Sequence, residues 1–157
     1  MPRQPLTDIL GNPGPTLPFP AMERHFKRDI SELSVIVPFL EEAASRYDLD
    51  TGTSFALNMV VEELYTNMVK YNGNGADHIM VSVEREGDWL TIDLVDFDSE
   101  PFDYSEAGDV DTSASLHERK PGGLGIHLVK RFMDEVMYQY KDRKTTIRLG
   151  KRLTQDA

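Results

Sequence analysis

Apolar residues follow a helical pattern over residues 31–47. They recur at three- and four-residue intervals, the spacing that places side chains along one buried stripe of a helix. Pro38 interrupts the pattern, and an interior proline destabilises a helix by about 3 kcal/mol. We therefore expect the helix to begin near Ser34, with Pro38 close to its first turn. The expected stripe consists of Leu33, Ile36, Val37, Leu40, Ala44 and Tyr47.

A second helix is predicted to follow and to run to about Tyr71. Asp50, Thr51 or Thr53 can cap its start, because short polar side chains accept hydrogen bonds from the first free backbone N–H groups. The asparagines and glycines at 72–75 then end the helix. Its apolar face is expected to hold Ala56, Val60, Leu64 and Met68.

Apolar and polar residues then alternate in two segments, residues 77–86 and 89–95. Alternation on both sides of a tight turn is typical of an antiparallel hairpin with one face on a core. The other expected elements are a short strand within residues 21–30, a helix at about 124–133 and two strands at about 135–140 and 145–149.

This order of elements predicts the fold class. Helices that alternate with pairs of strands pack together on one face of a mostly antiparallel sheet, so we expect an α+β, two-layer α/β sandwich. Residues 21–157 are expected to form a single domain. Residues 1–20 hold six of the nine prolines, which indicates a flexible tail. The polar segment 98–121 is long for a loop in a small domain, which is typical of functional or mobile loops.

Composition narrows the possible partners. The net charge of -10 opposes binding to nucleic acids; it serves solubility or attracts a basic partner. The absence of cysteine excludes disulfides and thiolate chemistry. The chain lacks both a signal-peptide pattern and an apolar run of the roughly 20 residues needed to cross a membrane. We therefore expect a cytoplasmic protein that does not insert into a membrane.

Three segments carry the candidate chemistry, and the first lies on the second helix. Glu63 and Asn67 are four residues apart and share one helical face, with Lys70 one turn further on. A carboxylate can deprotonate or orient a hydroxyl, and an amide oxygen is a hard ligand suited to Mg²⁺. The same stripe, taken alone, also fits a solvated helix face with a Glu–Lys contact.

The second segment is a glycine loop that opens a helix, formed by Gly122, Gly123, Leu124 and Gly125. Glycines let the backbone approach a phosphate, and the free N–H groups and dipole at a helix start favour an anion. Arg119 and Lys120 just upstream could add positive charge. The loop is not a Walker motif, and by itself it also fits a flexible connection into a helix.

The third segment is the strand that ends at Asp96. A carboxylate there could accept a hydrogen bond from the amino group of adenine, although an isolated aspartate at a turn is common. The order of the three segments, an acid–amide helix, a strand ending in aspartate and a glycine loop, makes coincidence far less probable than for any one of them. Together they indicate a nucleotide pocket.

The three segments resemble the N, G1 and G2 boxes of the GHKL (Bergerat) ATP-binding fold, which histidine kinases, gyrase and Hsp90 share. The match to the small anti-sigma factor serine/threonine kinases of bacterial partner switching is closer. It rests on residues 63–69 and 122–136, on the start of the first strand at residues 17–21, and on Thr145, which lies where such kinases carry a threonine near adenine. The resemblance covers roughly residues 17–150.

The resemblance implies a role for each segment. Asn67 would ligate Mg²⁺, Glu63 would be the catalytic base or orient the acceptor hydroxyl, and Asp96 would read adenine. Residues 122–125 would hold the phosphates under a lid formed by residues 99–121. The activity implied is phosphoryl transfer from ATP to a serine or threonine of a STAS-domain antagonist, by a homodimer that also binds a sigma factor or an equivalent regulator. The cofactor-binding set would also include Lys70, Arg119, Lys120 and Thr145.

Two departures from the family pattern keep alternatives open. Asp98 replaces the glycine of the G1 box, which adds bulk and negative charge near the nucleotide and suggests a protein-binding module whose nucleotide site has decayed. Lys70 and Tyr71 resemble histidine kinases more closely, which suggests a detached histidine-kinase catalytic domain. No helical phosphoacceptor region fits upstream of Glu63, and His25 lies in an expected strand, where a structural role is simpler.

Overall fold

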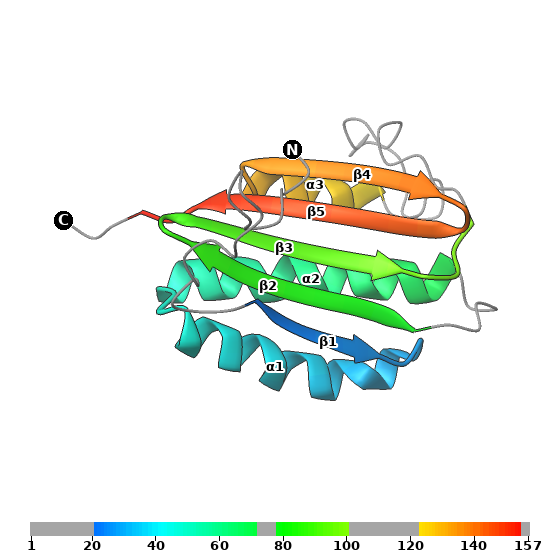
Figure 1. Cartoon of the computed structure of the whole chain (residues 1–157), viewed down its shortest axis with the longest axis horizontal. Helices are drawn as coiled ribbons and strands as arrows, with labels where there is room; N and C mark the ends of the chain where they lie inside the picture. Colours follow the sequence, from blue (N-terminus) through cyan, green and yellow to red (C-terminus); the bar gives the residue numbers. More distant parts are fainter. Residues whose placement is uncertain (1–20, 72–77, 101–122, 155–157) are drawn as a thin grey trace, which may run out of the picture.

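Five strands form one antiparallel sheet in a computed structural model that describes residues 21–71, 78–100 and 123–154. Helices α1, α2 and α3 all lie on one face of this sheet (Figure 1), so the predicted α+β two-layer sandwich is confirmed. No helix among these residues is long and apolar enough to cross a membrane. The sheet order is β1-β2-β3-β5-β4, with β1 (Met22–Phe26), β2 (Ile79–Glu86), β3 (Trp89–Asp96), β4 (Glu135–Lys141) and β5 (Lys144–Arg152).

The first long helix, α1 (Leu33–Arg46), begins directly after a short 3-10 turn, η1 (Ile30–Glu32). The helix begins one residue before Ser34, so the predicted start is confirmed, and Pro38 lies in its second turn. Proline removes the bond to the carbonyl four residues earlier. Here that carbonyl belongs to Ser34, which is exposed like Pro38 itself, so water can satisfy it.

The buried face of α1 also differs from the predicted stripe. Ile36 and Leu40 are buried as expected, but Phe39 and Ala43 are buried in place of Val37 and Ala44, which are half-buried. The Phe39 ring packs edge-to-face on Phe26 of β1, with 5.7 Å between ring centroids. Because this contact lies between separate elements, the helical periodicity could not identify it.

The central helix, α2 (Thr51–Tyr71), begins after Asp50, one of the three candidate caps: the Thr53 amide donates to Asp50 Oδ1 over 2.6 Å. The predicted apolar face is buried, but burial continues around the helix. The cause is its position between α1 and α3, beneath the sheet (Figure 1). The buried residues of α2 are Thr53, Ala56, Leu57, Val60, Val61, Leu64, Tyr65, Asn67 and Met68.

The ends of several elements meet at one end of the sheet. There β1 and β3 end while β2 and β5 begin, as the register shows: Ile79 faces both Phe26 and Asp96, and Asp96 faces Thr145. Helix α3 (Gly123–Phe132) runs antiparallel to α2 (Figure 1). Phe132 at its end packs edge-to-face on Phe55 near the start of α2, at 6.3 Å. The start of α3 therefore lies toward the second half of α2, at the same end of the sheet.

Candidate functional site

The fold brings most of the predicted site to this end of the sheet. The second half of α2 supplies Glu63 and Asn67, the end of β3 supplies Asp96, and the start of β5 supplies Thr145. Lys70 is exposed in the last turn of α2. Arg119, Lys120 and Gly122 lie outside the described residues, as does almost all of the expected lid.

Asn67 is the most informative side chain of the acid–amide pair. It is only 5% exposed, and its Nδ2 atom has no hydrogen-bond partner among the described residues. A buried polar atom left unsatisfied is unfavourable by about 1–3 kcal/mol, so a native partner is expected. The two ends of an amide exchange places by a simple flip, so this site can present either an N–H donor or an oxygen ligand.

A magnesium ion fits this position only together with a nucleotide. Among the residues that the structure describes, no group of three or more histidines, cysteines or carboxylates could hold a metal. Mg²⁺ is usually bound by one or two protein oxygens and completed by phosphates and water. The Asn67 amide oxygen would be such a protein ligand, with half-buried Glu63 one turn away on the same face.

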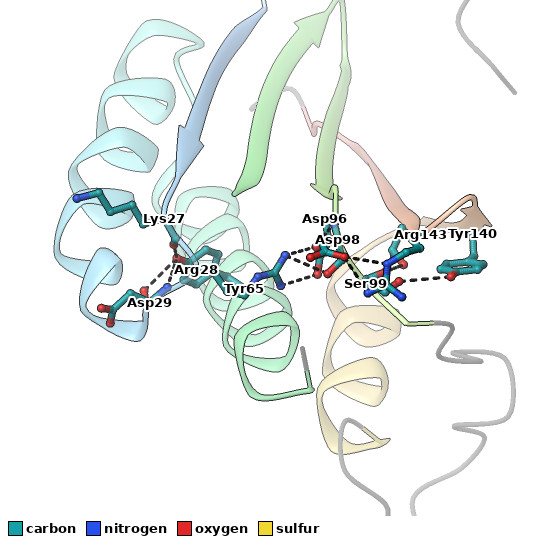
Figure 2. Close-up of polar contacts among 10 residues, drawn as sticks. Lys27, Arg28, Asp29, Tyr65, Asp96, Asp98, Ser99, Tyr140 and Arg143 are labelled. Atoms are coloured by element: carbon teal, nitrogen blue, oxygen red, sulfur yellow. Dashed lines mark hydrogen bonds and ion pairs between the residues drawn. The ribbon is translucent and has the colours of Figure 1, made fainter. Parts of the chain in front are cut away.

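Asp96 is fully buried and ion-paired. The Arg28 guanidinium binds both carboxylate oxygens: Nη1 donates to Oδ2 over 2.9 Å, and Nη2 donates to Oδ1 (Figure 2). The backbone amide of Asp98 donates to Oδ1 over 3.0 Å. Arg28 was not among the predicted site residues. The sequence offered only a general indication: a carboxylate at the end of a buried strand needs a positively charged partner. It does not show which lysine or arginine is that partner.

Tyr65 of α2 holds the segment that carries Arg28. Its hydroxyl lies within hydrogen-bonding distance of the Lys27 carbonyl and, at 3.0 Å, of the Asp29 carbonyl (Figure 2). The Asp29 amide in turn donates to the Tyr65 oxygen over 3.4 Å. Burial raises the pKa of Tyr65, so the phenol stays protonated and can donate. The helix that carries Glu63 and Asn67 therefore also fixes the backbone around Arg28.

The Asp98 side chain points to the turn between β4 and β5. Its Oδ1 accepts from Arg143 Nε over 2.9 Å and lies 2.8 Å from Arg143 Nη2 (Figure 2). The hydrogen bond to Asp98 raises the pKa of Arg143. The negative charge that the sequence introduces in place of a glycine is thus matched by a positive charge.

Thr145 lies across the sheet ladder from Asp96 and is buried beside Ser99. The hydroxyls of Thr145 and Ser99 are hydrogen-bonded to each other. Ser99 is also held through its backbone: its amide donates to the Arg143 carbonyl over 2.8 Å, and its carbonyl accepts from the Tyr140 hydroxyl over 3.3 Å. The residues just after Asp96 are therefore fastened to the β4–β5 hairpin.

The start of α3 supplies backbone donors. Gly123, Leu124 and Gly125 are its first three residues, and the first N–H groups of a helix have no partner within the helix. Their direction and the helix dipole favour an anion at this point. The arrangement therefore combines a buried amide, a half-buried carboxylate, a buried acid paired with Arg28 and a helix start that favours an anion.

Comparisons with known proteins agree with this arrangement. A family model described as a histidine kinase-like ATPase domain matches residues 26–151. No curated protein sequence matches the chain significantly.

Two solved structures are similar in fold. The RsbU and RsbW domains of a Mycobacterium tuberculosis protein match with 16% identity and a TM-score of 0.65, over 89% of this chain and 34% of that one. This chain thus spans about a third of the length of that solved chain. A chain of the SiaB–SiaC complex from Pseudomonas aeruginosa matches with 14% identity and a TM-score of 0.59, over 82% of this chain and 88% of that one. At these identities the likeness is one of fold.

Proposed function

Because this chain belongs to the histidine kinase-like ATPase family, which confirms the predicted GHKL resemblance, we propose that it is a partner-switching serine/threonine kinase. It binds Mg-ATP, phosphorylates a STAS-domain antagonist and sequesters a sigma factor or an equivalent regulator. The observation that carries the proposal is the buried side-chain amide of Asn67, one helical turn from Glu63. Its Nδ2 atom has no hydrogen-bond partner among the described residues.

In the proposed reaction the acceptor hydroxyl attacks the γ-phosphorus of ATP. The new O–P bond replaces the bond to the bridging oxygen, ADP leaves, and Glu63 takes the hydroxyl proton. Asn67 would hold Mg²⁺, which when bound neutralises phosphate charge. Asp96 would accept from the adenine amino group, and residues 122–125 would bind the phosphates. Lys70, Arg119, Lys120 and Thr145 complete the proposed nucleotide site. Positioning of the reactants and neutralisation of phosphate charge account for most of the rate enhancement in enzymatic phosphoryl transfer.

The proposed partners follow from the similar folds. One of the two similar chains contains RsbU and RsbW domains and the other comes from a SiaB–SiaC complex, which supports the proposal of a protein partner for this chain too. We extend the proposal to a homodimer, as the resemblance implies, and to a location in the cytoplasm, as expected from the sequence composition.

The test is a transfer assay with the wild-type chain, Mg-ATP and a purified STAS-domain protein. Mass spectrometry should find phosphoserine or phosphothreonine on that protein, and EDTA should abolish it. An acid-labile phosphohistidine would instead support the histidine-kinase alternative. Tight binding to the partner without calorimetric binding of Mg-ATP would overturn the kinase proposal in favour of a decayed module.

Replacing Asn67 with alanine is expected to weaken Mg-ATP binding by at least about tenfold. Loss of an outer-shell residue alone usually lowers metal affinity by about 10–100-fold, and Asn67 would be a direct ligand. Calorimetry with and without Mg²⁺ measures this. Asn58→Ala is the matched control, because Asn58 lies on the same helix and its Nδ2 donates to the Ser54 carbonyl over 2.9 Å. Equal Mg-ATP affinities for the two variants would contradict the proposed role of Asn67 as a magnesium ligand.

Replacing Asp98 with glycine is expected to change Mg-ATP affinity by less than about fivefold. The Asp98 carboxylate is already neutralised by Arg143, such exposed pairs contribute about 0–1 kcal/mol, and glycine keeps the backbone N–H that donates to Asp96. Titration calorimetry on both proteins measures the ratio. A gain of tenfold or more would mean that Asp98 weakens the pocket.

A further inference from the structure

We propose that Arg28 competes with the nucleobase for the Asp96 carboxylate, and so lowers the preference of the pocket for adenine. The inference rests on the proposed function, in which Asp96 reads the base. It assigns a specificity-determining role to a residue outside the three sequence segments.

The first support is the geometry of the pair. Arg28 is bound to both oxygens of Asp96, with side-chain exposures of 4% for Arg28 and 0% for Asp96. Nη2 of Arg28 also donates to the Asp98 carbonyl over 3.3 Å (Figure 2). A carboxylate with no exposed surface cannot contact a ligand. A base can reach Asp96 only after Arg28 has released at least part of it.

The second support is that a residue of the proposed catalytic helix, Tyr65, holds the backbone segment that carries Arg28. Its neighbours Lys27 and Asp29 are held through their backbones by Tyr65. Asp29 is further fixed by accepting the Ser31 amide over 2.9 Å, at the start of η1. Since Tyr65 lies between Glu63 and Asn67 in the sequence of α2, the proposed catalytic helix also holds the backbone on both sides of Arg28.

The chemistry of purines then predicts opposite effects on two nucleotides. The 6-amino group of adenine donates, so it needs a carboxylate oxygen and competes with the Arg28 N–H groups. The 6-oxo group of hypoxanthine accepts, so it can take an N–H from Arg28 and is repelled by a bare carboxylate. Arg28 should therefore disfavour ATP and favour ITP, relative to a pocket without it.

The experiment measures dissociation constants of Mg-ATP and Mg-ITP by titration calorimetry, for the full wild-type chain and the Arg28→Met variant. The preference for ATP over ITP is expected to rise at least about tenfold in the variant, the effect of one hydrogen bond to a charged group. Arg143→Met is the matched control. It removes the arginine that pairs with Asp98 and should leave the preference unchanged.

An unchanged ATP-to-ITP preference in Arg28→Met, with both nucleotides bound, overturns the inference and leaves the proposed function standing. Failure of both proteins to bind either nucleotide overturns the proposed function and the inference with it. If Arg28→Met does not fold, Arg28→Lys replaces the two-pronged donor with a single ammonium group. It should raise the preference by a smaller factor, and a wild-type preference there also overturns the inference.

Discussion

The Glu63→Gln protein is expected to transfer phosphate about 10²–10⁴-fold more slowly than the wild-type chain, the usual contribution of a general base. Glutamine keeps the size of the side chain and can still hydrogen-bond a hydroxyl, but it cannot take the proton. Glu63 is half-buried and lies one turn from Asn67, so Mg-ATP affinity should change little. Single-turnover transfer to the STAS-domain protein measures the rate, and calorimetry measures the affinity.

The neighbouring carboxylate provides the control for this prediction. Glu62 is also half-buried on α2, but successive helix residues point about 100° apart, so it leaves the face of Asn67. Glu62→Gln should therefore transfer phosphate at close to the wild-type rate. Two outcomes would contradict the proposed role of Glu63: similar rates for both variants, or a loss of rate in Glu63→Gln that is matched by an equal loss of affinity.

The second large effect is expected on stability, at the Arg28–Asp96 pair. Replacing one member leaves the other charge buried and uncompensated, so Arg28→Met or Asp96→Asn should lower the free energy of unfolding by roughly 3–5 kcal/mol. The variant with both replacements should lose less than the sum of the two, because neither leaves the other's charge unpaired. Urea denaturation followed by circular dichroism measures all four proteins.

A second arginine–aspartate pair, which is more exposed than the first, distinguishes the effect of burial on stability from the effect of the ion pair alone. Arg148 binds both oxygens of Asp93 across β5 and β3, at 2.8 and 2.9 Å, but the side chains are 29% and 17% exposed. Water screens this pair, so Arg148→Met should lower the free energy of unfolding by only about 1 kcal/mol. Equal losses for Arg28→Met and Arg148→Met would contradict the view that burial makes the first pair critical.

Several features were predictable because they depend on neighbours in the sequence. The Asp50 cap and the buried face of α2 follow from helical spacing and from hydrogen bonding within one turn. The β2–β3 hairpin follows from alternation on both sides of a turn. The predicted buried face of α1 was less accurate, because Phe39 is buried by its contact with Phe26 in another element.

The sequence by itself determined the elements of the sandwich and the order of the acid–amide helix, the strand-ending aspartate and the glycine-led helix, since all of these are local patterns. Only the tertiary structure decided which charges meet. Arg28 and Asp96 are 68 residues apart, and Arg143 and Asp98 are 45 apart. The chain has 17 lysines and arginines, and the packing of β1, α2 and β3 brings Arg28 to the buried Asp96 carboxylate. Spacing along the chain carries no record of that packing.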